Sequence, residues 1–352
     1  MKKTTLLMSV IFTIATITGC SGNNATSASV FYYTYSDTYI SNVRSSLGKS
    51  LENEKISYQD YDSNGNQTTQ TEQVQTAVTK GSKALVVNLV NTGSNDAANS
   101  IINIAKSSDI PVIFFNREVS DEAVKSYDKC AFIGTDAQEA GHMQGEMIGE
   151  YIVNNFEQID LNKDGKISYI LFKGEEGNNE AIYRTKYSVE DADKVLENAG
   201  KSKLEFYDKS NPNKYLVDKN GQWSAAAANE YMTTALASYN DTNKNMIELV
   251  ICNNDGMAEG AISALNSVGY NNGGVKRIPV FGVDATDAAK ELIKSGKMTG
   301  TIKQDAEGMA KTIVHLLNNV LNGKQIMDNT GSFQVDSGVN KIRIPYSKYL
   351  GN

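Results

Sequence analysis

The sequence predicts an α/β protein of two lobes, each built on a doubly wound parallel sheet, with a cleft between the lobes. From Ser29 onward, short apolar runs alternate with longer segments in which apolar residues recur at helical spacing. Strands that alternate with helices form parallel sheets, and right-handed crossovers place the helices on both faces. About ten runs have the length and composition of strands, which is too many for one comfortable sheet. Two lobes therefore explain the pattern better than one.

The strand and helix candidates follow one another along the chain. Strands are expected within residues 30–36, 55–63, 83–90, 111–116, 130–136, 166–174, 203–208, 247–255, 278–284 and 298–304. Helices are expected over 38–51, 70–80, 96–105 and 138–153, among others. Each of these helices separates two expected strands, as the connection between parallel strands requires.

The N-terminus predicts export from the cytoplasm. Lys2 and Lys3 precede an apolar run, 6–17, that is too short to span a membrane, and a small-residue cleavage site follows at Gly19. Residues 1–19 therefore read as a signal peptide. Cys20 stands at the first mature position, which resembles a bacterial lipoprotein signal and implies lipidation of Cys20; an ordinary signal peptide with an incidental cysteine is the alternative. Residues 20–29 are then a lipidated, flexible linker that anchors an extracytoplasmic body to the cell membrane.

Composition argues against several classes of function. The net charge is −7 and no cluster of lysine or arginine stands out, which argues against binding to nucleic acid. His142 and His315 are the only histidines, so a zinc cluster or a histidine-based catalytic centre is not expected. No GxGxxG or P-loop follows a strand, so no nucleotide cofactor is expected. Cys130 and Cys252 lie in apolar runs and are expected to be buried free thiols, with a disulfide as the alternative.

Short polar side chains follow many of the expected strands. They are Ser36 and Asp37, Asn91, Asn116, Thr135 and Asp136, Asn253 to Asp255, and Asp284. Ligands of open α/β sheets bind at the carboxyl ends of the strands, and two such edges can face one another across a crevice. The alternative is that these residues are only turn residues and helix N-caps. Their number favours a binding cleft.

A loop at 160–168, DLNKDGKIS, has the oxygen-ligand spacing of an EF-hand-type calcium loop. Gly165 stands where such a loop turns sharply. The oxygen donors are Asp160, Asn162, Asp164, the main-chain carbonyl of Lys166, and Ser168. The twelfth position is Leu171, inside an apolar run, so a last ligand must come from elsewhere in the fold. The alternative is a polar turn between a helix and a strand.

Several of these stretches together resemble the periplasmic glucose/galactose-binding proteins, receptors of sugar ABC transport and chemotaxis. They are KGSKALVVNLV, PVIFFNREVS, SYDKCAFIGTD, DLNKDGKISYILFKGE, IELVICNNDGMAEGA, IPVFGVDA and TGTIKQDA. The resemblance implies a periplasmic binding protein fold of type I, in which a sugar lies between two hinged lobes. It implies an N-terminal lobe of residues 30–135 and 305–334 and a C-terminal lobe of residues 136–304 and 335–352. The hinges are then expected near 134–136, 304–305 and 331–337.

The resemblance also implies a set of sugar-binding residues. In the N-terminal lobe it places Asp37, Tyr39, where the family has a stacking phenylalanine, and Asn116. In the C-terminal lobe it places Asn178 in place of a histidine, Glu180 in place of an aspartate, and Gln304 in place of an asparagine, together with Arg184, Trp223, Asn254 and Asp284. Carboxylates, amides and a guanidinium suit sugar hydroxyls, and flat aromatic rings suit the apolar faces of a pyranose. The substitutions are expected to retune affinity or the preferred sugar.

For the metal, the resemblance implies a structural Ca²⁺ completed by Glu248, a remote glutamate at the start of a strand. Ser168 stands where the family has glutamine, so a water can complete the shell. The expected function is that of a monomeric lipoprotein which presents glucose or galactose to an ABC transporter permease, without enzymatic activity.

Other functions are less well supported. A receptor for a different monosaccharide, or one that also serves chemotaxis through a chemoreceptor, differs little in sequence. A sugar-responsive repressor needs a DNA-binding headpiece before the first strand, where a signal stands instead. A glycosidase needs an acid and base pair that flanks a bond, whereas the carboxylates are expected to pair with amides and Arg184.

Overall fold

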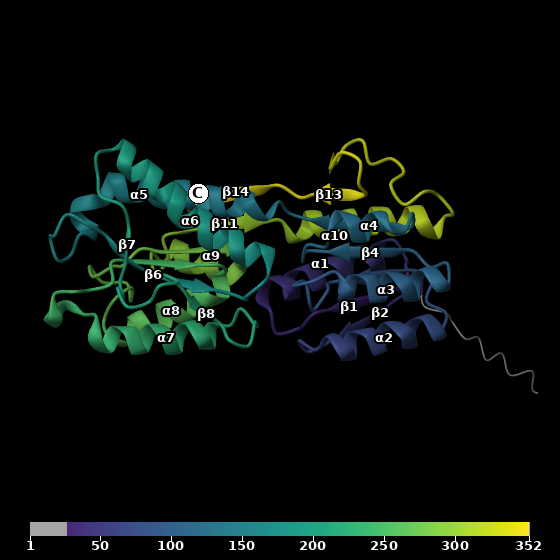
Figure 1. The fold of residues 1–352 in the computed structure, drawn as a ribbon, viewed down its shortest axis with the longest axis horizontal. Coiled ribbons are helices and arrows are strands. Elements are labelled where there is room, and N and C mark those ends of the chain that lie inside the picture. Colours follow the sequence, from purple (N-terminus) through teal and green to yellow (C-terminus); the bar gives the residue numbers. More distant parts are fainter. Residues whose placement is uncertain (1–26, 352) are drawn as a thin grey trace, which may run out of the picture.

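The computed structural model describes residues 27–351 as two α/β lobes that lie side by side along the long axis (Figure 1). Residues 1–19 and Cys20, for which a signal and a lipid anchor are expected, lie outside the described residues. No helix within residues 27–351 is both long and apolar enough to cross a membrane.

The N-terminal lobe is built on a seven-stranded sheet within the described chain, in the order β12-β13-β5-β4-β3-β1-β2. Its elements are β1 (Ala28–Tyr32), α1 (Thr38–Asn53), β2 (Tyr58–Asp62), α2 (Gln67–Thr79), β3 (Leu85–Val87), α3 (Asp96–Ser107), β4 (Val112–Phe115), α4 (Asp121–Lys125), β5 (Cys130–Gly134), α10 (Ala306–Leu321), β12 (Gln334–Val335) and β13 (Lys341–Arg343). Its strands are parallel except in the β12–β13 pair.

The C-terminal lobe is built on a second sheet, in which β14-β11-β10-β9-β6-β7 are neighbours and β8 also pairs with β6. Its elements are α5 (Ala137–Ile159), β6 (Ser168–Lys173), α6 (Asn179–Asn198), β7 (Glu205–Phe206), β8 (Leu216–Val217), α7 (Ala225–Ser238), a 3₁₀ turn η1 (Asp241–Asn243), β9 (Leu249–Cys252), α8 (Asp255–Ser267), β10 (Val280–Asp284), α9 (Asp287–Lys294), β11 (Gly300–Gln304) and β14 (Tyr346–Tyr349). Only β14 runs antiparallel to its neighbour among the described strands of this sheet.

Each sheet is buried on both faces, which explains why its strands are continuous apolar runs. In β1, Val30 and Tyr32 join the core under α1 and α10, whereas Phe31 faces the core under α2 and α3. The C-terminal sheet is covered in the same way by α7 and α8 on one face and by α5 and α6 on the other. The sequence prediction of two doubly wound lobes is therefore confirmed.

Nine of the ten expected strand segments contain an observed strand, and the first, 30–36, overlaps β1, which begins two residues earlier. The four expected helices correspond to α1, α2, α3 and α5. Cys130 and Cys252 are buried free thiols, as expected. His142 and His315 lie in α5 and α10. The expected linker, 20–29, is too long at its C-terminal end, because Ala28 and Ser29 already pair with β2 in β1.

The described chain crosses between the lobes three times. The first crossing lies between β5 and α5, and the second between β11 and α10. The expected third hinge at 331–337, and the assignment of residues 335–352 to the C-terminal lobe, are wrong. β13 pairs with β5 of the N-terminal lobe, and the chain crosses only between Arg343 and Tyr346.

Ion pairs hold this late segment in the N-terminal lobe. The Lys341 ammonium is buried, where it pairs with Glu118 and lies 2.8 Å from an Asp121 carboxylate oxygen. It also donates to the Val119 carbonyl at 2.7 Å. A strand that contains a lysine and an arginine is difficult to recognise as buried from its sequence, because its charges are satisfied by residues far away in the chain.

Candidate functional site

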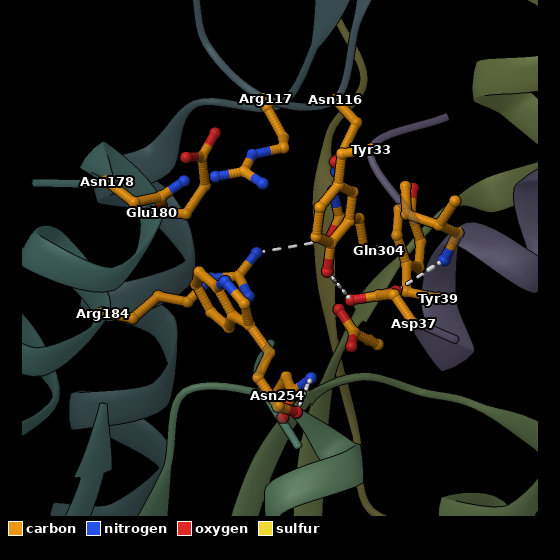
Figure 2. A pocket seen from close by; sticks show the side chains of 13 residues that line it. Tyr33, Asp37, Tyr39, Asn116, Arg117, Asn178, Glu180, Arg184, Asn254 and Gln304 are labelled. Atoms are coloured by element: carbon orange, nitrogen blue, oxygen red, sulfur yellow. Dashed lines mark hydrogen bonds between the residues drawn. The ribbon is translucent and has the colours of Figure 1, made fainter. Parts of the chain in front are cut away.

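A pocket lies between the lobes at the carboxyl ends of the parallel strands. All ten sugar-site residues expected from the sequence line it: Asp37, Tyr39, Asn116, Asn178, Glu180, Arg184, Trp223, Asn254, Asp284 and Gln304. Figure 2 shows Asn178, Glu180 and Arg184 entering from one side and Tyr33, Asp37 and Tyr39 from the other. The structure therefore brings the expected set together.

Three of these residues also cap helices. The Asp37 carboxylate accepts from the Ile40 amide at 2.8 Å, the Asn178 side chain from the Ala181 amide at 3.1 Å, and the Asn254 side chain from the Met257 amide at 2.9 Å. An N-cap needs a short polar side chain at the helix start, and in this fold the helix starts face the cleft. The two interpretations of these residues, as caps and as cleft residues, therefore both hold.

Backbone strain is concentrated around the pocket. Asn116 (φ 64°), Trp223 (φ 55°) and Asp284 (φ 128°) all have positive φ, as does Ala285 (φ 55°). Such conformations cost an L-residue about 1–3 kcal/mol each and persist where the surrounding structure enforces them. Strain at three pocket-lining residues points to a site whose side-chain directions matter.

A buried guanidinium lies at the centre of the polar lining. Arg184 on α6 donates to the Asn253 carbonyl at 2.9 Å, to the Gln304 side chain at 3.2 Å and to the Tyr346 hydroxyl at 2.9 Å. Burial raises the pKa of the Asp284 carboxyl well above its ordinary value, and Arg184 opposes that shift. Burial also raises the pKa of Glu180, with Arg184 again in opposition.

Several buried polar atoms of the lining have no hydrogen-bond partner within residues 27–351. They are Arg117 Nε, Glu180 Oε1, Arg184 Nε and Gln304 Nε2. Buried polar atoms are normally paired, and leaving one unpaired costs about 1–3 kcal/mol. Three donors and one acceptor on residues that line one pocket fit a small ligand rich in hydroxyls.

The sequence did not indicate Tyr33, Ile40 and Arg117, which also line the pocket. The Arg117 guanidinium lies 4.5 Å from the Tyr33 ring centre and forms an ion pair with Glu175 of the other lobe. The Tyr33 hydroxyl donates to Asp37 at 2.7 Å. Arg117 directly follows Asn116 at the end of β4, and that adjacency was the available signal. The ion pair holds the two lobes in contact beside the pocket.

Trp223 is nine-tenths buried at the pocket wall and packs on Gly174, just after β6. A Cβ at Gly174 would lie 2.1 Å from the indole ring, so only glycine fits there. The Arg184 guanidinium lies 5.7 Å from the Trp223 ring centre. The indole thus contacts the backbone at one strand end and lies near the pocket cation.

The 160–168 loop folds around its own side chains. Asp160 accepts from the Asp164 and Gly165 amides at 3.1 and 3.0 Å, and Asp164 accepts from the Lys166 amide at 2.9 Å. Glu248 reaches the loop, where it accepts from the Leu161 and Ser168 amides at 2.7 and 2.9 Å. The Ser168 hydroxyl instead donates to the Met246 carbonyl at 2.7 Å.

These residues fit a hard cation in chemistry, because every candidate donor is an oxygen. Within the described residues, however, no three His, Cys, Asp or Glu side chains converge as in a metal site. A cation here would therefore rely on the Asn162 side chain and the Lys166 carbonyl as well as on carboxylates. Ser168 is the least suited of the expected ligands, because its hydroxyl is directed toward Met246.

Two parallel-sheet lobes, three crossings and a polar pocket between them are the architecture of a two-lobed substrate-binding protein. The chain belongs to the periplasmic binding protein domain family, whose model matches residues 28–325. It is 36% identical to the D-galactose/methyl-galactoside binding periplasmic protein MglB of Haemophilus influenzae. The alignment of 348 residues covers 98% of this chain and 96% of that protein. The sequence resemblance to this family is therefore confirmed.

Other relatives are more distant. The D-xylose-binding periplasmic protein of Escherichia coli is 26% identical over an alignment that covers 74% of this chain and 68% of that protein. An ABC transporter solute binding protein from Bacillus halodurans, solved with bound myo-inositol, is 25% identical with a TM-score of 0.69 and covers 92% of this chain and 94% of that chain.

Proposed function

We propose that this protein is the extracytoplasmic substrate-binding component of a sugar ABC transporter and that it encloses a monosaccharide, glucose or galactose by preference. The observation that carries the proposal is the interlobe pocket, in which ten expected residues meet and buried polar atoms lack partners in the described part of the chain. The galactose-binding relative, which spans nearly the whole chain, supports the choice of sugar.

The pocket chemistry suits a neutral sugar. The Glu180 Oε1 atom accepts from a hydroxyl, and the Arg184 and Gln304 nitrogens donate to hydroxyl oxygens. The Trp223 ring offers a flat apolar surface for C–H groups. A ligand that contacts both lobes stabilises their closed arrangement by its differential affinity for it, and the closed form is what a permease would receive.

Titration of the protein with a panel of sugars tests this proposal. Trp223 is the only tryptophan, so its fluorescence reports on the pocket. Glucose and galactose are expected to change the emission and raise the melting temperature, more strongly than ribose, xylose or myo-inositol. If no member of the panel does either, the protein is not a receptor for these sugars.

A pair of variants localises the binding. Glu180→Gln keeps the side-chain shape but removes the charge, and charge-assisted hydrogen bonds are about twice as strong as neutral ones. The variant is expected to bind the preferred sugar about tenfold more weakly by calorimetry, since an imperfectly paired buried group costs about 1–3 kcal/mol. Glu190→Gln changes an exposed residue of the same helix and is the matched control. Equal affinities in the two variants would remove Glu180 from the site.

We also propose a structural Ca²⁺ in the 160–168 loop, held by Asp160, Asn162, Asp164, the Lys166 carbonyl and Glu248. Two sets of contacts support it: the hydrogen bonds from loop amides to Asp160, which fold the loop, and those from the Leu161 and Ser168 amides to Glu248, which bring this glutamate to the loop. The ion would supply a fixed positive charge that joins the loop to the start of β9.

Lipidation of Cys20 is a further part of the proposal and rests on the order of residues at the N-terminus. Mass spectrometry of the protein from membranes tests it, because a diacylated N-terminal cysteine adds the mass of its lipid chains. A mature protein without the added lipid mass would show that residues 1–19 are an ordinary signal peptide and that Cys20 is not lipidated.

A further inference from the structure

The three crossings between the lobes are bonded to one another beside the pocket. The Ile344 amide in the third crossing donates to the Gly134 carbonyl in the first at 2.7 Å. Tyr346, at the start of β14, pairs in register with Gln304 at the end of β11, where the second crossing begins. A change in the backbone conformation of one crossing therefore alters its hydrogen bonds to another crossing.

The Tyr346 hydroxyl connects this region to the pocket. Tyr346 is 4% exposed, and its oxygen accepts from Arg184 Nη2 at 2.9 Å. The same hydroxyl lies 2.7 Å from Thr135 Oγ1 in the first crossing. A guanidinium can only donate, so the Tyr346 oxygen is the acceptor in the first bond, and either hydroxyl can donate in the second. The Tyr346 hydroxyl therefore bridges Arg184 and Thr135.

Arg184 is thereby linked to all three crossings, to two directly and to the first through Tyr346. One Nη2 contact goes to Gln304 at 3.2 Å and another to Tyr346, through which it reaches Thr135. Its Nε atom is buried without a partner in the described chain and belongs to a residue that lines the pocket. Tyr346 itself is not among the residues that line the pocket in Figure 2. The Tyr346 hydroxyl reaches the pocket lining through Arg184.

We infer that Tyr346 is a positioning residue for ligand binding, which orients the Arg184 guanidinium through its hydroxyl and couples that orientation to the crossing at Thr135. The inference rests on the proposed function, since Arg184 is assigned there to the sugar. The guanidinium is fully oriented only when the Tyr346 hydroxyl is held by both Arg184 and Thr135, as seen here.

The substitution Tyr346→Phe tests the inference, because it removes the hydroxyl and keeps the ring. Arg184 Nη2 then retains Gln304 but loses its second acceptor. The preferred sugar is expected to bind about tenfold more weakly by calorimetry, the effect of leaving one buried donor poorly paired. Tyr349→Phe makes the same change on the same strand, where Tyr349 pairs with Thr301, and is expected to bind normally. Equal affinity of Tyr346→Phe and the wild type would overturn the inference.

Thr135→Val tests the second step of the relay, because valine matches threonine in shape but cannot hydrogen-bond to the Tyr346 hydroxyl. The double variant with Tyr346→Phe is expected to bind no more weakly than Tyr346→Phe alone, since both remove one chain of bonds. Losses that multiply in the double variant would show that Thr135 acts independently. If Tyr346→Phe melts well below the wild type, Thr135→Val alone decides: its affinity must fall for the relay to stand.

A spectroscopic measurement without ligand separates this inference from the proposed function. The Arg184 guanidinium lies 5.7 Å from the Trp223 ring centre, so its displacement alters the environment of the only tryptophan. Tyr346→Phe is expected to shift the emission maximum of the ligand-free protein, and Tyr349→Phe is not. An unshifted emission maximum in Tyr346→Phe would overturn the relay even if sugar binds. A shift in a protein whose wild type binds no sugar would support the relay and refute the proposed sugar.

Discussion

Asp255 shows at the scale of a single residue how a charge is accommodated behind the pocket. It is fully buried at the start of α8, where it accepts from the Thr301 hydroxyl at 2.7 Å and the Thr286 amide at 2.9 Å. Burial nevertheless raises the pKa of this carboxyl to about 7, against the effect of those bonds. The neighbouring Asp284 carboxyl has a raised pKa for the same reason.

The raised pKa makes stability depend on pH in a definite direction. The folded state holds the Asp255 proton more tightly than the unfolded chain does, where an aspartate titrates near pH 4. The free energy of unfolding should therefore fall as pH rises from about 4 to about 7, by at most about 1.4 kcal/mol per pH unit from this group, and then level off. Below about pH 4 the carboxyl is protonated in both states and adds no dependence.

Asp255→Asn is expected to flatten this part of the profile. The amide oxygen still accepts from Thr286, and the amide nitrogen donates to Thr301, so the local bonds survive. Urea unfolding at several pH values between 5 and 8 measures the slope. Asp287→Asn, which changes an exposed aspartate, is the matched control. A slope in Asp255→Asn as steep as that of the wild type would assign the dependence to other groups.

The 160–168 loop carries the prediction at the scale of an element. If the loop holds Ca²⁺, a chelator is expected to lower the melting temperature by several degrees and to change sugar affinity only modestly, because the loop joins the far end of β9 rather than the pocket. Added Ca²⁺ should restore the melting temperature.

Glu248→Gln serves as the internal comparison for the metal. It weakens the proposed ligand set, so the melting temperature of the variant should no longer respond to chelator or to added Ca²⁺ over the same concentration range. If the melting temperature of the variant responds as strongly as that of the wild type, the ion binds elsewhere in the protein. A wild-type protein that responds to neither treatment would leave the loop as a hydrogen-bonded turn.

The short elements near the C-terminus mark where sequence reasoning stops. Long apolar strands such as β6 and β10 were evident because a sheet covered on both faces demands continuous apolar side chains. β12 has two residues and β13 three, and β13 includes a buried lysine. No periodicity exists over so few residues, and the carboxylates that neutralise Lys341 lie more than 200 positions earlier.

The pocket was predictable for a different reason. Its residues stand at strand ends and helix starts, where chain order and sheet topology determine which side chains meet. Arg117 escaped prediction because it contributes through its contact with Glu175 of the other lobe, and that pairing depends on how closely the lobes approach. Sequence spacing within one lobe holds no information about that distance. Tyr33 contacts Asp37 within its own lobe, and its place in an apolar run gave no signal that it lines the pocket.

At the scale of the whole molecule, the Arg117–Glu175 ion pair joins the lobes. The Arg117 side chain is 6% exposed and that of Glu175 24%, so solvent screens the pair less than a surface pair. Glu175→Gln is expected to increase the radius of gyration of the ligand-free protein in small-angle X-ray scattering and to weaken sugar binding about two- to tenfold, the effect of losing a partly buried charge pair of about 0.5–1.4 kcal/mol.

Glu176→Gln is the matched control for that experiment, because Glu176 pairs with Lys173 of its own lobe. Its scattering and affinity should match the wild type. High salt should increase the radius of gyration of the ligand-free wild-type protein but not that of Glu175→Gln, since the variant has no charge pair to screen. Identical scattering from Glu175→Gln and Glu176→Gln would mean that other contacts keep the lobes together.

The late third crossing has a consequence for how the two sheets are completed. The last described strands complete both sheets: the β12–β13 hairpin adds to β5 of one lobe, and β14 adds to β11 of the other. Without residues 334–349, β5 and β11 would each keep one neighbour, β4 and β10, and would form an open edge of their sheet. The closing of both sheet edges thus depends on one late segment of the chain, which couples the completion of the two lobes.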